Sequence, residues 1–224
     1  SHASGATYAI GTTTVTTTAT DDSGNSTTCI FDVRVTDTTA PAITCPDSVS
    51  AEATSSSGAA VSYDAATATD NGDDSISIAY DIASGSTFAI GTTAVTATAT
   101  DNYDNASTCS FDVTVVDTTV PTITCADAPV PVEATSSAGA AVSYNAAVST
   151  DIGDSSVDIT YSAASASTFA IGTTTVTATA TDDSGNVSTC SFDVVVTDNT
   201  DPTITCADAP GTAEATSSSG AAVS

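Results

Sequence analysis

Acidic side chains recur along this sequence at a fixed interval, and their spacing suggests cation binding. Of 27 acidic residues only three are Glu, and Glu52, Glu133 and Glu214 lie 81 residues apart. Aspartates such as Asp37 and Asp117 recur at nearly the same interval. Carboxylates are hard oxygen donors, and Ca²⁺ takes about six to eight oxygen ligands, so loops that bring several carboxylates together would suit this ion. The spacing does not match an EF-hand loop.

The candidate metal ligands are the carboxylates that recur at the joints between repeats and at the starts of loops. They are Asp37, Glu52, Asp70, Asp101, Asp104, Asp117, Glu133, Asp151, Asp182 and Asp198. The alternative is that Asp and Asn simply form turns and keep the chain soluble. Both interpretations stay open on the sequence alone, and Ca²⁺ is the cofactor that the pattern suggests.

The six cysteines fall into two recurring phrases. Three lie in S/T-T-C-x-F-D-V and three in P-x-I-T-C. Cys29 and Cys45 are 16 residues apart, which is roughly 50 Å in an extended chain and far beyond disulfide distance. We therefore expect pairing inside each repeat, and Cys29 and Cys206 would pair outside this sequence. The expected disulfides are Cys45–Cys109 and Cys125–Cys190.

Cysteine pairs of this kind indicate an oxidising, extracellular setting. N-glycosylation acceptors of the form N-x-S/T recur at equivalent positions, at Asn25, Asn105 and Asn186. The alternative is a turn motif that duplication has copied three times. We keep both interpretations here.

Catalytic chemistry has little support. The single histidine, His2, has no equivalent in the other repeats, and the cysteines are structural, so no Cys/His nucleophile pair exists. We expect no catalytic residues and no enzyme activity.

Short apolar-polar alternations predict the elements that must hold these side chains. Val95, Ala97 and Ala99 would face one way, and Phe111 and Val113 belong to a second inward row. A further row would begin at Val61 and Tyr63. No segment has helical spacing. About seven short strands in ~80 residues predict a small antiparallel β-sandwich of immunoglobulin type.

The predicted fold class is all-β. The repeats predict tandem immunoglobulin-like β-sandwich domains arranged as beads in a rod. Short proline-containing joints, such as 116–121, would stiffen the array. We expect the chain to begin and end within repeats of a longer protein. The predicted boundaries are 1–36 for the end of one repeat, 37–116 and 117–197 for two complete repeats, and 198–224 for the start of another.

The charge excludes some partners. The formal net charge is −26, with Arg34 as the one basic residue apart from histidine. Nucleic acid binding needs a basic surface, and no apolar run approaches the ~20 residues that would insert into a membrane. We therefore expect neither partner.

Three ordered phrases resemble the hyalin repeat (HYR) family. They are F-A-I-G-T-T-x-V-T-x-T-A-T-D at Phe88–Asp101 and Phe169–Asp182, S-T-C-S-F-D-V-x-V-x-D at Ser107–Asp117 and Ser188–Asp198, and P-T-I-T-C at Pro121–Cys125 and Pro202–Cys206. The resemblance covers essentially the whole sequence. It implies an immunoglobulin-like extracellular module associated with adhesion, often in tandem in secreted or surface proteins, without a common enzymatic activity.

The sequence therefore predicts an extracellular structural or adhesive protein that forms a stalk, fibre or surface filament. Its partners would be other copies of the same chain or cell-surface and matrix ligands. The alternative is a Ca²⁺-dependent ligand- or carbohydrate-recognition module, or the spacer of a larger secreted enzyme.

Overall fold

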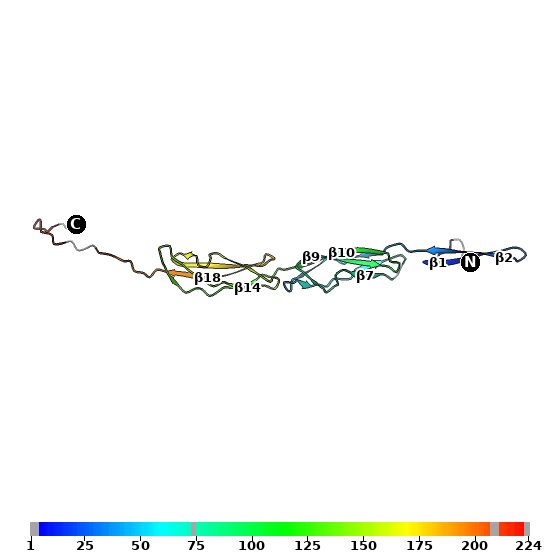
Figure 1. Cartoon of the computed structure of the whole chain (residues 1–224), viewed down its shortest axis with the longest axis horizontal. Coiled ribbons are helices and arrows are strands. Elements are labelled where there is room, and N and C mark those ends of the chain that lie inside the picture. The colour runs from blue at the N-terminus through cyan, green and yellow to red at the C-terminus, as the bar shows by residue number, and fades with distance from the viewer. Residues whose placement is uncertain (1–4, 73–74, 207–210, 222–224) are drawn as a thin grey trace. The chain divides into compact units, whose positions relative to one another are not determined.

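The computed structural model describes residues 5–72, 75–206 and 211–221 (Figure 1). The described residues form strands, turns and irregular segments, and none of them belongs to a helix that could cross a membrane. The chain divides into two compact units. The first comprises residues 1–124, 148–160 and 179–189, and the second comprises residues 125–147, 161–178 and 190–224.

A β-hairpin precedes the first complete repeat. Strands β1 (Gly11–Thr20) and β2 (Ser26–Val35) pair antiparallel from Gly11↔Val35 to Thr20↔Ser26. The repeated Thr and Val of these strands favour an extended, half-buried backbone.

The first complete repeat is an immunoglobulin-like β-sandwich. Its strands are β3 (Ala42–Thr44), β4 (Val49–Glu52), β5 (Ala59–Ala60), β6 (Thr67–Thr69), β7 (Ser77–Tyr80), β8 (Thr87–Phe88), β9 (Gly91–Thr100) and β10 (Ala106–Val116). The main sheet has the order β4-β10-β9-β7, and β3-β6 and β5-β8 form two smaller sheets. All these pairs are antiparallel except β4 with β10, which is parallel.

Strands β9 and β10, neighbours in Figure 1, supply much of the core. The predicted alternation is confirmed there, because Val95, Ala97 and Ala99 are fully buried, while Phe111 and Val113 are buried from the partner strand. Thr96 and Thr98 occupy the intervening positions of β9, and Asp112 lies between the two buried residues of β10.

The prediction of a strand that begins at Val61 and Tyr63 is only partly correct. Both side chains are buried, but β5 ends at Ala60. The reason is that a side chain replaces the strand ladder at this point. The Ser84 hydroxyl accepts from the Tyr63 backbone N–H at 2.9 Å and donates to the Tyr63 carbonyl at 3.1 Å.

A disulfide and an aromatic cluster close the first complete repeat. Cys45 and Cys109 are bonded, with 5.8 Å between their Cα atoms, and Cys45 packs against the core. The Tyr63 ring meets Phe111 edge-on, with centroids 4.9 Å apart. Closing a loop of 64 residues in this way stabilises the fold chiefly by restricting the unfolded chain.

The second complete repeat has the same plan. Its strands are β11 (Thr122–Thr124), β12 (Val132–Glu133), β13 (Ala140–Ala141), β14 (Val148–Thr150), β15 (Asp158–Tyr161), β16 (Thr168–Phe169), β17 (Gly172–Thr181) and β18 (Val187–Thr197). The sheet orders are β12-β18-β17-β15, β11-β14 and β13-β16. Cys125 is bonded to Cys190. Cys29 and Cys206 are exposed free thiols in this chain, and their pairing with residues beyond it stays a prediction.

Gly58 occupies a turn that only glycine fits. Its φ is +101°, and an added Cβ would lie 1.8 Å from the carbonyl oxygen of Phe88, which pairs with Ala59 across β5 and β8. Gly91 has a similar φ of +115° but open space where its Cβ would be. The two positions therefore separate backbone strain from steric collision.

We expect G58A to destabilise the first complete repeat by about 2 kcal/mol more than G91A, because it adds a backbone clash to the strain at positive φ. Hydrogen exchange of the Val95 amide measures the stability of this repeat separately from the second. Equal losses for the two variants would contradict the collision at Gly58.

Candidate metal centres at the joints

Each complete repeat gathers three aspartates at one end. In the first triad, Asp37 follows β2, Asp70 follows β6 and Asp101 follows β9, and one carboxylate oxygen from each lies within 4.8 Å of the others. The second triad repeats the arrangement and consists of Asp117 after β10, Asp151 after β14 and Asp182 after β17. All six residues belong to the first compact unit.

Strand pairing brings the first triad together. Ala42 pairs with Thr69, so the start of β3 and the end of β6 lie at the same edge. The Ser107 hydroxyl donates a hydrogen bond to the carbonyl of Pro41, which ties β10 to the start of β3. In the second repeat, Thr122 pairs with Thr150 in the same register. The triads are therefore a consequence of the topology.

One carboxylate oxygen of each triad aspartate accepts a hydrogen bond from a backbone N–H. The donor lies two or four residues later in the sequence. Asp37 Oδ1 accepts from Thr39 at 3.0 Å, and Asp70 Oδ1 accepts from Gly72 at 2.7 Å. Asp117 and Asp151 make the same bonds with Thr119 and Gly153. These Asx-type turns fix the carboxylates in place.

The other oxygen of four of these aspartates has no hydrogen-bond partner among the described residues although it is buried. The four atoms are Oδ2 of Asp37, Asp70, Asp117 and Asp151. Asp117 as a whole is only 8% exposed. A buried carboxylate oxygen without a partner is unfavourable, and three carboxylates close together repel one another. An oxygen-only cluster of this kind has the donor set of a hard cation.

Asn105 and Asn186 hold the third aspartate of each triad. The Asn105 side-chain amide donates to Asp101 Oδ2 at 2.8 Å, and its backbone N–H donates to Asp101 Oδ1 at 2.8 Å. Burial alone would raise the pKa of Asp101, but these hydrogen bonds outweigh it and lower the pKa below its ordinary value. The pKa of Asp182 is lowered in the same way by Asn186. Both carboxylates are therefore held ionised.

The same two asparagines are predicted glycosylation acceptors. The Nδ2 atoms of Asn105 and Asn186 also donate to the carbonyl oxygens of Asp37 and Asp117, at 3.4 and 3.1 Å. Each side-chain amide thus connects the joint before a repeat to the aspartate at the end of a long strand in that repeat. Asn25 makes the equivalent bonds to Asp21 on an exposed hairpin. Glycosylation at all three stays a prediction.

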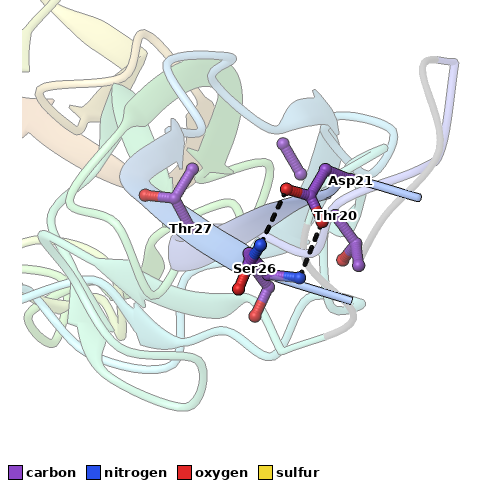
Figure 2. A pocket seen from close by; sticks show the side chains of 6 residues that line it. Thr20, Asp21, Ser26 and Thr27 are labelled. Carbon is purple, nitrogen blue, oxygen red and sulfur yellow. Dashed lines mark hydrogen bonds between the residues drawn. The ribbon is translucent and has the colours of Figure 1, made fainter. Parts of the chain in front are cut away.

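The hairpin turn at Asp21 borders a hollow of about 430 Å³, which is open to solvent and is seen in Figure 2 beside Thr20, Ser26 and Thr27. In the complete repeats the position equivalent to Asp21 is buried, with Asp101 only 5% exposed. The hollow therefore marks a face that the rest of the sandwich covers in the complete repeats.

Two glycines complete the triads, and sequence analysis did not single them out. An added Cβ at Gly72 would lie 2.1 Å from Oδ2 of Asp37, and one at Gly153 would lie 2.2 Å from Oδ2 of Asp117. The glycine backbone thus packs directly against the joint carboxylate. Their 81-residue spacing, next to Asp70 and Asp151, was the available signal.

Four of the predicted ligands lie outside the triads. Asp104 is an exposed turn residue with a φ of +64°. Asp198, also exposed, accepts from the Thr200 backbone N–H at 3.2 Å. Glu52 and Glu133 hydrogen-bond the joints instead, as described next. His2 lies outside the described residues.

The Glu52 side chain extends from the end of β4 to the joint that contains Asp117 of the second triad. Its Oε1 accepts from the Thr118 N–H at 2.7 Å and from the Thr119 hydroxyl at 3.3 Å, and its Oε2 accepts from the Thr118 hydroxyl at 3.1 Å. The bond from the Thr118 backbone is the main cause that lowers the pKa of Glu52. Glu133 is bound in the same way by Asn199 and Thr200, and the Asn199 backbone is the main cause of its lowered pKa.

The fold and its strand-end carboxylates define a chain of tandem β-sandwich repeats with an acidic cluster at the start of each complete repeat. The HYR domain model matches residues 1–35, 36–115 and 116–196, so the chain belongs to the HYR domain family.

Two curated relatives are similar over most of the chain. Hyalin of Strongylocentrotus purpuratus is 34% identical over 209 residues, which cover 89% of this chain and 17% of that protein. Hyalin of Lytechinus variegatus is 31% identical over 208 residues, covering 89% of this chain and 39% of that protein. The chain thus spans well under half the length of either relative.

Among solved structures, extracellular cadherin domains 3–6 of protocadherin gamma B2 match 85% of this chain and 61% of their own, with a TM-score of 0.39 and 15% identity. Domains EC22–24 of mouse cadherin-23 match 84% of this chain and 74% of their own, with a TM-score of 0.38 and 15% identity.

We expect the Glu52 and Glu133 contacts to be lost in acid. Because hydrogen bonding lowers both pKa values from the ordinary 4.5, the stabilisation is fully present above pH 4.5 and disappears as pH falls through the lower, folded-state pKa. An NMR titration of the Thr118 and Asn199 amides measures this, with midpoints below 4.5. Midpoints at or above 4.5 would contradict the contacts.

Proposed function

We propose that this chain is part of an extracellular structural and adhesive protein whose repeats are fixed to their joints by Ca²⁺. The observation that carries the proposal is the pair of equivalent aspartate triads, each with two buried carboxylate oxygens that lack a partner among the described residues. A bound dication would neutralise the repulsion and complete the coordination of those oxygens.

The donor set favours Ca²⁺ over other common ions. Every candidate ligand atom is a carboxylate oxygen, which suits hard cations and not the nitrogen and sulfur preferences of zinc or copper. Ca²⁺ tolerates irregular geometry, whereas Mg²⁺ requires a near-octahedral site and retains several waters. Carbonyls or water would have to supply the remaining ligands.

The position of the triads suggests what the ion does. Asp37 and Asp117 belong to joints, and the other aspartates belong to the sandwich that follows. A cation shared by these groups would restrain the joint, so an array of such repeats would form a stiff stalk, fibre or surface filament. The disulfide in each complete repeat would keep the individual domain closed under load.

Family membership and the hyalin relatives support an extracellular or cell-surface location and a role in adhesion. The partners would be other copies of the chain or surface and matrix ligands. A net charge of −26 keeps copies apart unless cations screen it, which gives Ca²⁺ a second role in association. The acceptor sites for glycans would be Asn25, Asn105 and Asn186, of which Asn25 is the most exposed. No catalytic activity is proposed.

We expect Ca²⁺ to raise the melting temperature of the full chain relative to EDTA, because binding to the folded state alone stabilises by about 2.7 kcal/mol at a concentration 100 times Kd. Small-angle scattering should give a longer, stiffer particle with Ca²⁺. D37N and D117N should each remove part of the response, whereas D64N, an exposed site outside the triads, should leave it intact. The proposal would be overturned if neither the melting temperature nor the particle length differed between Ca²⁺ and EDTA.

We also expect G72A and G153A to weaken Ca²⁺ binding about tenfold or more, because the new methyl group displaces the joint carboxylate that packs there. The charge is unchanged, and neither glycine has a positive φ, so the ion-free stability should change little. Calorimetric titration of the full chain measures the affinity. Normal affinity in both variants would show that the joint aspartates are not ligands.

A further inference from the structure

The Glu52 contacts place a carboxylate of one repeat beside the aspartate triad of the next. Thr118 and Thr119, the residues bound by Glu52, directly follow Asp117. Asp117 itself accepts from Thr119 through Oδ1 and from Asn186 through its carbonyl. The short segment 117–119 is therefore held by the repeat before it and by the repeat after it.

The contact is preserved where the residues change. At the following joint, Asn199 and Thr200 stand in the positions of Thr118 and Thr119, and Glu133 accepts from the Asn199 N–H at 2.6 Å. The Asn199 amide, at 2.9 Å, takes the part of the Thr118 hydroxyl. Two different side chains thus donate to equivalent carboxylates, so the contact does not depend on threonine at this position.

Side-chain length explains why glutamate is used here in a chain that otherwise uses aspartate. Glu52 pairs in register with Val116, yet it must reach the N–H of Thr118, two residues further along. The additional methylene provides that reach. All three glutamates of the sequence, including Glu214, occupy this repeat position.

We propose that Glu52 is a positioning residue for the second triad. By fixing residues 118 and 119, Glu52 holds the Asp117 carboxylate toward Asp151 and Asp182 before any cation arrives. Cation affinity at a joint then depends on the repeat that precedes it, and by reciprocity a bound cation strengthens the glutamate contact. This inference rests on the Ca²⁺ binding proposed above.

The test uses the full chain in two backgrounds, each with one triad disabled. In the D70N background only the second triad is intact, so Ca²⁺ binding measures that triad. In the D151N background Ca²⁺ binding measures the first triad. Calorimetric Ca²⁺ affinity is measured with E52A, with E52Q, whose amide oxygen still accepts a hydrogen bond, and with S50A, a matched change on the same strand face of β4. Hydrogen exchange of the Thr118 amide is measured without Ca²⁺.

We expect E52A in the D70N background to weaken Ca²⁺ binding about tenfold, the usual effect of removing a group that orients a ligand. E52Q should restore most of the affinity, S50A should have no effect, and exchange at Thr118 should accelerate in E52A alone. In the D151N background E52A should change nothing, because Glu52 does not contact the joint of the first triad.

Three outcomes would overturn the inference. Unchanged affinity of the second triad in E52A would remove the positioning role while leaving Ca²⁺ binding intact. An equal loss at both triads would show that Glu52 acts only through general stability. No binding in either background with Glu52 present would overturn the proposed function, and this inference with it.

Discussion

Crowding of like charge at the start of each complete repeat is the constraint around which the surrounding structure is arranged. Three carboxylates with oxygens within 4.8 Å of one another repel strongly in a partly buried setting. Backbone N–H groups hold Asp37 and Asp70, the Asn105 amide holds Asp101, and the Gly72 backbone packs against the Asp37 carboxylate. These contacts fix the carboxylates without neutralising them. Two carboxylate oxygens of each triad nevertheless keep no hydrogen-bond partner among the described residues.

The sandwich supplies the rigidity that such crowding needs. Its core consists largely of Val and Ala from the two long strands, with aromatic contacts at Tyr63 and Tyr144. A core of small side chains gives a limited hydrophobic contribution in a domain of this size. The disulfide compensates by closing most of the repeat into one loop. Strand ends that carry Asp70 and Asp101 are thus anchored at fixed positions, and the aspartate triad inherits its geometry from the covalent and hydrophobic framework.

The sequence predicted the parts of this structure that depend on local pattern. Alternation placed Val95 and Phe111 in the core, and the fixed spacing of the aspartates picked out all six triad residues. The spacing did not distinguish Glu52 and Glu133 from the triad aspartates. A carboxylate that accepts a hydrogen bond from a backbone N–H has the same sequence pattern as one that could bind a cation. Gly72 was missed because its role is a tertiary contact with Asp37. The predicted strand at Tyr63 ended early because the Ser84 side chain replaces its ladder partner.

The sequon asparagines bring two proposed properties into competition. A glycan on Nδ2 leaves that nitrogen a single hydrogen, whereas Asn105 and Asn186 each use Nδ2 for a strand-end carboxylate and a joint carbonyl. Glycosylation at these two positions would therefore give up one of the bonds that hold the triad. Asn25 differs because it is exposed and its Nδ2 donates to an exposed Asp21. Where the sandwich is complete, the physical argument favours the asparagine as a structural link between joint and strand end, and the glycan proposal is strongest at Asn25.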